Sequence, residues 1–471
     1  MFAGLLPPAG SYEPMSALDA VFLHTDNDRA PMHLGAVSVF EPGPFVDPAG
    51  RFRLDAVRAH VESRLHLLPL FRKKVAEAPL RQGRPVWVDD ERFDVRHHVK
   101  LVAVPRPGTR EQLAELAAWI LSHPLDRHRP LWQLWFVEGL EDGRVAMVEK
   151  LHHAVADGVS GVDVAVALLD AEPDPDRPPG PDWSPRRPPD PVQLLVRAEL
   201  DRLARPSRWG SRLLGSLPGP RDVVAAIDGA VDALRSVVDM ATRSHPLVER
   251  ISSDRALTWT TLPLSEVRDV AHDHGVTVND VALALVAGGV HRVLAERGPV
   301  EPDSEVEVVV PVSTRPDDHV VELGNSVSAI LVRIPVGDLV PSDRLDAVNR
   351  AMAAHKAHHQ ARGTGLALDG LEAVGPVTLA LVAQAMHHQP VADLVVTNVP
   401  GPQIPLYFMG ARMVEAVPVV PLGGNLAMGI AVLSYDDDLC ISVVAHGDAA
   451  ADARTVVAGV RADAQVLLGD R

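Results

Sequence analysis

Two adjacent histidines stand out in the stretch EKLHHAVADGVSG at 149–161, because Asp157 and Gly158 follow four and five residues after His153. A neutral imidazole, with an ordinary pKa near 6.5, can take a proton from an alcohol at neutral pH. The same residue types also occur in metal sites, in serine hydrolase turns and as hydrogen-bonded polar pairs at strand ends. The stretch therefore has four readings, and one of them is the base of an acyl transfer reaction.

Two of these readings lack a required part. A metal could use His153 and Asp157 at positions i and i+4, but a bend between them breaks the helix that would align them, and the sequence offers no evident third ligand. A hydrolase elbow needs G-x-S-x-G, whereas Gly158, Ser160 and Gly161 make only G-x-S-G. We therefore expect no metal here, and we expect Ser160 to pack or to begin a helix.

The elements around the histidines predict where they lie. RVAMVEKL at 144–151 is typical of a strand that follows a turn at Gly143, and GVSGVDVAVALLD at 158–170 is typical of a helix. Gly158 would ease the bend between the two, and Asp157 could cap the helix, which stabilises it by about 1 kcal/mol. The histidines are thus predicted at a bend between a strand and a helix.

The same mixture of strand and helix patterns runs through both ends of the chain. Strands are predicted at 32–40, 84–90, 257–264, 305–315, 325–336, 392–401, 425–437 and 439–448. Helices are predicted at 54–65, 110–123, 265–275, 279–298 and 452–468. The fold class is therefore α/β (α+β).

A proline-rich run at 171–191 divides the chain, since proline lacks the amide hydrogen that helices and central strands need. From there to about 250 the pattern is amphipathic helix without strand signals. With 471 residues, more than one hydrophobic core usually serves, we predict a first domain at 1–175, a proline-rich and helical linker at 176–250, and a second domain at 251–471.

Composition excludes several partners. The chain has 45 Lys and Arg against 62 Asp and Glu, a net charge of −17, which repels a nucleic acid backbone. Cys440 is the single cysteine and lies in an apolar run, so we expect a structural thiol and a reducing, cytoplasmic compartment. The N-terminus lacks the pattern of a secretory signal, and no uninterrupted apolar stretch reaches the roughly 18 to 20 residues of a membrane span.

The motif and several other segments resemble a known family. HHAVADG is similar to the HHxxxDG motif of bacterial wax ester synthases and acyl-CoA:diacylglycerol acyltransferases, in the superfamily of chloramphenicol acetyltransferases and peptide synthetase condensation domains. Further similar segments follow in family order and cover almost the whole chain: MSALDAVFLHTDNDRAPMHLGAVSVF, PLWQLWFVEGL, NDVALALVAGG, VPVSTR, LGNSVSAILVRIP and TNVPGPQIPLYFMGARM.

The resemblance implies two chloramphenicol acetyltransferase-like domains with an active-site tunnel between them. It implies an O-acyltransferase that moves a long-chain acyl group from acyl-CoA to the hydroxyl of diacylglycerol, of a fatty alcohol, or of both. Acyl-CoA is then a substrate, and no cofactor is expected. His153 would be the general base, the acceptor would attack the thioester directly, and no covalent acyl-enzyme would form.

The resemblance also assigns supporting residues. His152 would support the loop, and Gly158 would hold the bend. Asp157 would turn away from the substrate and pair with an arginine, for which Arg315 in VPVSTR is our candidate. Asn325 and Ser328 in GNSVS could donate hydrogen bonds near the thioester oxygen.

Two further motifs match the family. Pro130, Leu131 and Trp132 form its PLW motif, whose simplest role is an apolar turn packed in the core. Asn279 and Asp280 form its ND motif at a helix start, either as an asparagine cap or as part of the tunnel wall.

Two other functions remain open at this point. A condensation-type enzyme would take its acyl group from a carrier protein, although no carrier domain accompanies this chain. A surface protein of membranes or lipid droplets could keep the fold without activity, although His153, Asp157 and Gly158 are intact. For an acyltransferase with lipid substrates, and equally for such a surface protein, we expect peripheral attachment to the inner membrane face or to droplets through the amphipathic segment 192–245.

Overall fold

The computed structural model describes most of the chain. The described residues are 7–8, 10–79, 82–155, 164–176, 180–200, 247–248, 251–313, 327–362 and 392–469. Side chains of 312–313, 327–329 and 355–362 lie outside this description.

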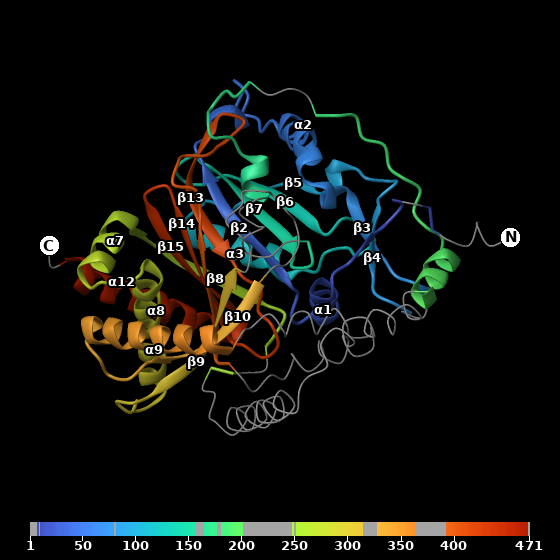
Figure 1. Cartoon of the computed structure of the whole chain (residues 1–471). Coiled ribbons are helices and arrows are strands. Elements are labelled where there is room, and N and C mark those ends of the chain that lie inside the picture. Colours follow the sequence, from blue (N-terminus) through green and yellow to red (C-terminus); the bar gives the residue numbers. More distant parts are fainter. Residues whose placement is uncertain are drawn as a thin grey trace, which may run out of the picture.

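The first large sheet combines strands from both ends of the chain (Figure 1). Its order is β12 (Tyr407–Phe408), β13 (Ala411–Val419), β2 (His33–Phe40), β7 (Val145–His152), β6 (Trp132–Glu138) and β5 (Val99–Ala103). All neighbours are antiparallel except β5 and β6. The late strand β13 therefore lies directly beside the early strand β2.

The second large sheet is built from the later half alone. Its order is β10 (Val327–Pro335), β9 (Glu305–Ser313), β11 (Leu394–Pro400), β14 (Met428–Tyr435), β15 (Asp438–His446) and β8 (Arg255–Pro263). Strand β11 runs parallel to both of its neighbours, and the other pairs are antiparallel. A small third sheet holds β1 (Glu13–Pro14), β4 (Val86–Asp89) and β3 (Lys73–Ala76).

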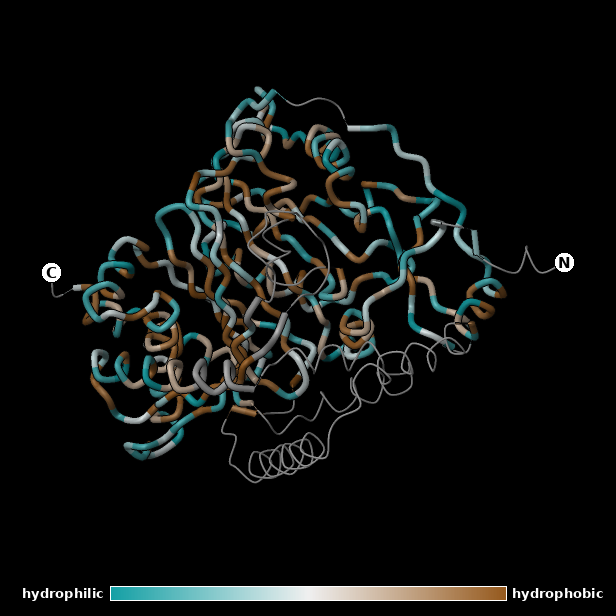
Figure 2. Tube along the Cα trace, viewed as in Figure 1, coloured by the Kyte–Doolittle hydropathy of each residue, from teal (hydrophilic) through white to brown (hydrophobic). Residues whose placement is uncertain are grey.

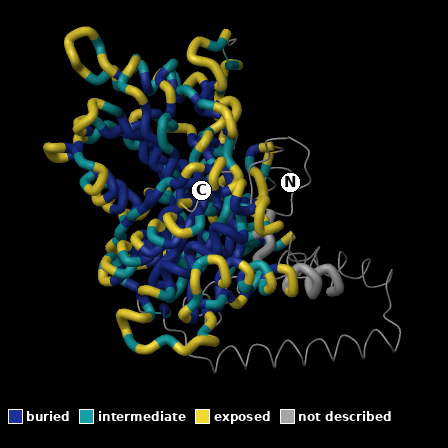
Figure 3. The backbone as a smooth tube through the Cα atoms, turned by 90° about the vertical axis from the view of Figure 1, so that its left-hand side faces the viewer, coloured by how far each residue is buried: buried dark blue, intermediate teal, exposed yellow. Residues whose placement is uncertain are grey.

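The helices pack on the faces of the two large sheets (Figure 1), and buried residues gather in the interior of the molecule (Figure 3). They are α1 (Ala17–Thr25), α2 (Leu54–Arg64), α3 (Arg110–Ser122), α7 (Leu264–Asp273), α8 (Val278–Arg297), α9 (Pro341–Arg362) and α12 (Ala450–Gly469). Residues 164–168 and 191–200 are helical as well, and 164–168 belong to the helix predicted at 158–170, whose start lies outside the described residues. Short 3-10 turns occupy Gly43–Phe45, Leu65–Leu67, Pro69–Arg72, Val95–His97 and Gly447–Ala449.

Three large apolar clusters fill the spaces between these layers (Figure 2). One lies between the first sheet and α1 and α2. The second surrounds α3 and joins the other face of the first sheet to β8 and β15. The third packs α7, α8, α9 and α12 on the second sheet. Helix α3 is thus the layer that both sheets share.

The sequence of α3 explains its place. Thr109 and Gln112 form a capping box, in which each side chain bonds the backbone of the other residue. Leu113, Ala117 and Leu121 recur at spacings of four and are buried. Their face packs in the shared cluster, so the helix is held from both sheets.

A polar contact fastens β13 in the first sheet. Glu415, beside a register shift in β13, accepts hydrogen bonds from Arg110 on α3 and from Trp259 Nε1 on β8, the latter at 2.8 Å. The Arg110 guanidinium also lies over the Trp259 ring, 4.7 Å from its centroid. One carboxylate therefore joins β13, α3 and β8.

The predicted mixture of strands and helices is confirmed, with ends that differ by one to three residues. Helices α1 and α9 as a whole, and strands β6 and β13, were not predicted. Cys440 is buried, and burial raises the pKa of its thiol, as expected of a structural cysteine. The division at 175 and 250 stays a prediction, and the pairing of β13 with β2 shows that the chain crosses between the halves.

One described helix, α8, is long and apolar enough to cross a membrane by length and composition. It is also largely buried, against α9 and α12 in the third cluster. The same composition is typical of a core helix in a globular domain.

A buried ion pair offers a test of the first half. Arg64 on α2 makes two hydrogen bonds to Asp170, at 3.0 and 2.6 Å, and both side chains are less than a tenth exposed. Asp170→Ala leaves the guanidinium buried without its partner, so the free energy of unfolding should fall by about 3 kcal/mol. Urea denaturation measures the loss. Asp55→Ala, which removes a fully exposed carboxylate from the same helix, should leave the urea midpoint unchanged.

Candidate active site at the end of strand β7

The paired histidines lie where β7 leaves the first sheet. His152 is the last residue of the strand, and its backbone N–H donates to the Leu131 carbonyl at 3.0 Å. His153 donates its backbone N–H to the Met32 carbonyl at 2.8 Å, and Val155 closes a turn on the His152 carbonyl. The predicted position of the histidines at the end of a strand is therefore observed. His153, the first residue after β7, is held by the Met32 carbonyl.

The His153 side chain lies against α1. Its ring stacks on Phe22 with centroids 3.8 Å apart and planes inclined by 23°. The residue is half-buried, and Nδ1 is the inaccessible side of the ring. Of the two ring nitrogens, Nδ1 is therefore closed to a substrate.

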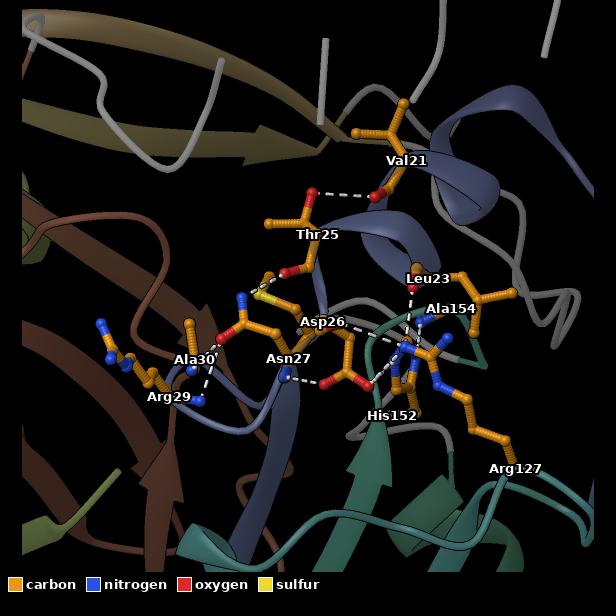
Figure 4. A network of polar contacts seen from close by, with 11 residues as sticks. Val21, Leu23, Thr25, Asp26, Asn27, Arg29, Ala30, Arg127, His152 and Ala154 are labelled. Atoms are coloured by element: carbon orange, nitrogen blue, oxygen red, sulfur yellow. Dashed lines mark hydrogen bonds and ion pairs between the residues drawn. The ribbon is translucent and has the colours of Figure 1, made fainter. Parts of the chain in front are cut away.

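The His152 side chain is buried, with 1% of its surface exposed. Nδ1 accepts a hydrogen bond from the backbone N–H of Ala154 at 3.0 Å, so this nitrogen carries no proton. The proton of the neutral ring is then on Nε2, which faces the Asp26 carboxylate at 3.7 Å (Figure 4). His152 thus supports the turn from within and does not present a free nitrogen.

Asp26, which lies just after α1, contacts several of these elements. Its carboxylate accepts from the Met32 N–H at 2.8 Å and from Arg127 Nη2 at 2.7 Å. Arg127 also donates to the Leu23 carbonyl at 2.9 Å, at the end of α1 (Figure 4). Burial alone would raise the pKa of Asp26, but the interactions with His152, Arg127 and Met32 outweigh it and hold the pKa well below its usual range.

Two more buried bases cap the end of α3 beneath this network. Lys150 Nζ donates to the carbonyls of Ile120, at 2.7 Å, and His123. His33 Nδ1 lies 2.9 Å from the Leu121 carbonyl and donates to it. Burial lowers the pKa of His33 to about 3 and that of Lys150 to about 7. These donors satisfy carbonyls that a helix end leaves without partners.

Glu149 points to the opposite face of β7, toward the cluster that contains Leu151. It is 2% exposed, and its Oε1 has no hydrogen-bond partner among the described residues. Burial raises the pKa of this carboxyl to about 8. A neutral acid therefore lies in the apolar layer beside the histidines.

The PLW residues lie within the core next to the histidine strand. Pro130, Leu131 and Trp132 are buried, and Trp132 Nε1 donates to the Phe71 carbonyl at 2.8 Å. The indole stacks on the rings of Phe71 and His98, with centroids 4.6 and 4.4 Å away. This environment agrees with an apolar turn, and Leu131 also holds the backbone of His152.

The ND motif lies at the start of α8, but the asparagine is not its cap. Thr277 is the cap residue and forms a capping box with Asp280, whose carboxylate accepts from the Thr277 N–H at 2.9 Å. Asn279, inside the first turn, accepts from Asn398 on β11 at 3.1 Å. The asparagine-cap alternative is therefore wrong, because the threonine hydroxyl occupies that role and Asn279 links the helix to a strand.

The remaining predicted residues are not placed. Asp157, Gly158, Arg315 and Asn325 lie outside the described residues, and the side chain of Ser328, on β10, does as well. The pairing of Asp157 with Arg315 stays a prediction. Within the part of the chain that is described, no three His, Cys, Asp or Glu side chains group as metal ligands.

Sequence reasoning missed the polar support of the motif. It consists of Asp26, His33, Arg127, Glu149 and Lys150. One signal was available: strand 145–152 is apolar on both faces apart from its last polar residues, so Glu149 and Lys150 had to be buried or end-capping. Asp26 and Arg127 gave no such local signal, because they meet only through the fold.

Family models match most of the chain. The catalytic domain model of wax ester synthases and diacylglycerol acyltransferases matches residues 15–282, and the C-terminal domain model matches 323–465. The chain belongs to this family. Its members are acyltransferases, and the histidine strand, the PLW residues and the ND motif all fall within the catalytic match.

Individual relatives agree. A putative diacylglycerol O-acyltransferase of Mycobacterium tuberculosis is 34% identical over 465 residues, covering 96% of each chain. The solved wax ester synthase/diacylglycerol acyltransferase of Marinobacter aquaeolei VT8 is similar with a TM-score of 0.66 and 23% identity, over 97% of this chain and all of that one.

The first condensation domain of the CDA synthetase has the same fold, with a TM-score of 0.56 at 17% identity. It covers 98% of this chain, and this chain covers 97% of it. The two-domain, mixed α/β fold expected from the resemblance is therefore confirmed.

The raised pKa of Glu149 predicts that the stability of the protein depends on pH. Its pKa is about 8 in the folded chain and 4.5 ordinarily, so folding takes up a proton between these values. The stabilising contribution is complete below pH 4.5 and falls as pH rises, by about 1.4 kcal/mol per unit up to pH 8. Glu149→Gln should therefore gain stability over wild type at pH 8 and differ little at pH 5, as measured by urea unfolding.

The matched control is Glu115→Gln, which removes an exposed carboxylate from α3. Its unfolding should follow the wild-type pH dependence. A Glu149→Gln curve that stays parallel to wild type from pH 5 to pH 8 would show that Glu149 is ionised in the folded protein.

Proposed function

We propose that the protein transfers a long-chain acyl group from acyl-CoA to the hydroxyl of diacylglycerol, of a fatty alcohol, or of both. The observation that carries the proposal is the half-buried His153, held beyond the end of β7 with Nδ1 inaccessible. The family of the chain and the names of its relatives, diacylglycerol acyltransferase and wax ester synthase, support the substrate class.

In the proposed mechanism His153 Nε2 takes the proton of the acceptor hydroxyl while the oxygen attacks the thioester carbonyl. The tetrahedral intermediate collapses, the carbon–sulfur bond breaks, and the thiolate of CoA takes the proton from the imidazolium. The products are the ester and free CoA. No acyl-enzyme and no cofactor take part, and backbone amides are candidates for the oxyanion donors.

We further propose that donor and acceptor meet in a tunnel between the halves. His153 faces α1 in the first half, and the Asn279–Asn398 contact joins α8 to β11 in the second. Asn398 and its neighbour Thr397 are only partly buried although they lie in a central strand. Such polar side chains are suited to a channel wall.

Purified protein with palmitoyl-CoA and either hexadecanol or dipalmitoylglycerol should release CoA and form the corresponding ester. His153→Ala should lower kcat by about 10²- to 10⁴-fold, the usual contribution of a general base. Thiol release and thin-layer chromatography of the lipids measure both products. His272→Ala, at an exposed position on α7, should match wild type.

Full turnover in His153→Ala would overturn the role of this residue. If wild type were silent with both acceptors but acylated an alcohol or amine from a carrier-protein thioester, the condensation-type alternative would replace the proposal.

We also propose a cytoplasmic protein that meets its water-insoluble acceptors at the inner membrane face or at lipid droplets. Of the segment 192–245, the structure describes 192–200, which lie in the helix at 191–200. There Leu194 packs on β4, while Val192 and Leu200 are about half-exposed. Exposed apolar side chains on such a helix can enter the lipid interface.

Charging this surface tests the attachment. The double variant Val192→Asp and Leu200→Asp should remove much of the protein from the pellet when it is sedimented with phosphatidylcholine vesicles. Val340→Asp, a similarly exposed valine far along the chain, is the control and should sediment like wild type. Equal sedimentation of the double variant would exclude this helix as the contact.

A further inference from the structure

Three structural elements contact His153, and each of them meets the Asp26 carboxylate, either directly or through Arg127. Phe22, on which the ring stacks, belongs to α1, and the Met32 carbonyl holds the backbone N–H. The third element is the turn that His152 begins. Asp26 binds the Met32 N–H, faces His152 Nε2, and holds the end of α1 through Arg127 (Figure 4).

We propose that Asp26 is a positioning residue for His153, acting through His152 and Met32. It does not touch the substrate. Its carboxylate fixes the tautomer of His152 and, with it, the turn that presents the base. This inference rests on the proposed function, because it assigns Asp26 a part in the step that His153 performs.

The tautomer is the physical link. The Ala154 N–H needs an acceptor at His152 Nδ1, so the ring must carry its proton on Nε2. A carboxylate opposite Nε2 favours that proton, as in the triads in which an aspartate orients a histidine. Removing the negative oxygen allows the proton to move to Nδ1, where it opposes the Ala154 N–H and opens the turn.

The same carboxylate fixes the backbone on the other side of His153. The Met32 peptide is held at both ends, since its N–H donates to Asp26 and its carbonyl accepts from His153. Arg127 is the cation that compensates the buried Asp26 charge. A displacement of about 1 Å at a reacting group costs on the order of 10²-fold in rate, so small shifts of this peptide matter.

Asp26→Asn tests the proposal, because the amide keeps the size and one oxygen of the side chain. Oδ1 of Asp26 accepts from the Met32 N–H, and Oδ2 faces both Arg127 and His152 Nε2–H, so the NH₂ group of the asparagine would meet a donor in either orientation. We expect kcat to fall by about 10²-fold while KM for palmitoyl-CoA stays within about threefold. Asp28→Asn, an exposed neighbour in the same loop, should keep wild-type kcat.

Two readouts separate positioning from a general loss of structure. Nitrogen-15 NMR of the folded protein should show His152 protonated on Nε2 in wild type and shifted toward Nδ1 in Asp26→Asn. His152→Asn keeps an acceptor for the Ala154 N–H but loses the group that faces Asp26. Its kcat should fall by a similar factor, and the double variant should be no slower than the slower single variant.

The outcomes are distinct. A kcat of Asp26→Asn within threefold of wild type, an unchanged His152 tautomer, or losses that multiply in the double variant would each overturn the positioning role. If Asp26→Asn does not fold, His152→Asn with wild-type kcat would overturn it. Wild-type protein without turnover on any acceptor would instead refute the proposed function, while the NMR result would still report the tautomer.

Discussion

The backbone pairing of β13 with β2 is the constraint on which the rest of the molecule depends. Residues 413–419, near the end of the chain, pair with 35–40 from its beginning, and β2 in turn pairs along its length with the histidine strand β7. Without β13, the hydrogen-bonding groups of β2 on that side would form an open sheet edge. The later half of the chain therefore supplies part of the sheet that carries the histidines of the first half.

This exchange explains why α3 and Glu415 lie where they do. A strand that crosses between halves has to be held at a fixed register, because a slip by one residue would turn its apolar side chains to the wrong face. Glu415 binds Arg110 and Trp259, so it fixes β13 to α3 and to the second sheet at the register shift. At its other end α3 is capped by His33 and Lys150, from β2 and β7. One helix thus connects the crossing strand to the histidine strand.

Much of this was predictable from local patterns, and the rest was not. The continuous apolar run of β7 and the helical apolar spacing of α12 are enough to predict these elements, and with β7 the place of the histidines after a strand. Strand β13 carries a proline and a register shift, and its partner lies far away in sequence, so local spacing does not reveal it. Asp26 and Arg127 are likewise separated by a hundred residues. A lone acid in a loop has no sequence feature that distinguishes a buried ion pair from a solvated one.

The different environments of His152 and His153 follow from the alternation of side chains along a strand. Successive side chains point to opposite faces, so Glu149 and Leu151 share the α1 side, while Val148 and Lys150 share the α3 side. His152 continues the second series and is buried against the Asp26 loop. His153 continues the first series, toward α1, and meets Phe22 just where the strand has ended. A slip of the β7 pairing register by one residue would exchange the two environments, so the register of β7 against β2 decides which imidazole is buried and which is only half-buried.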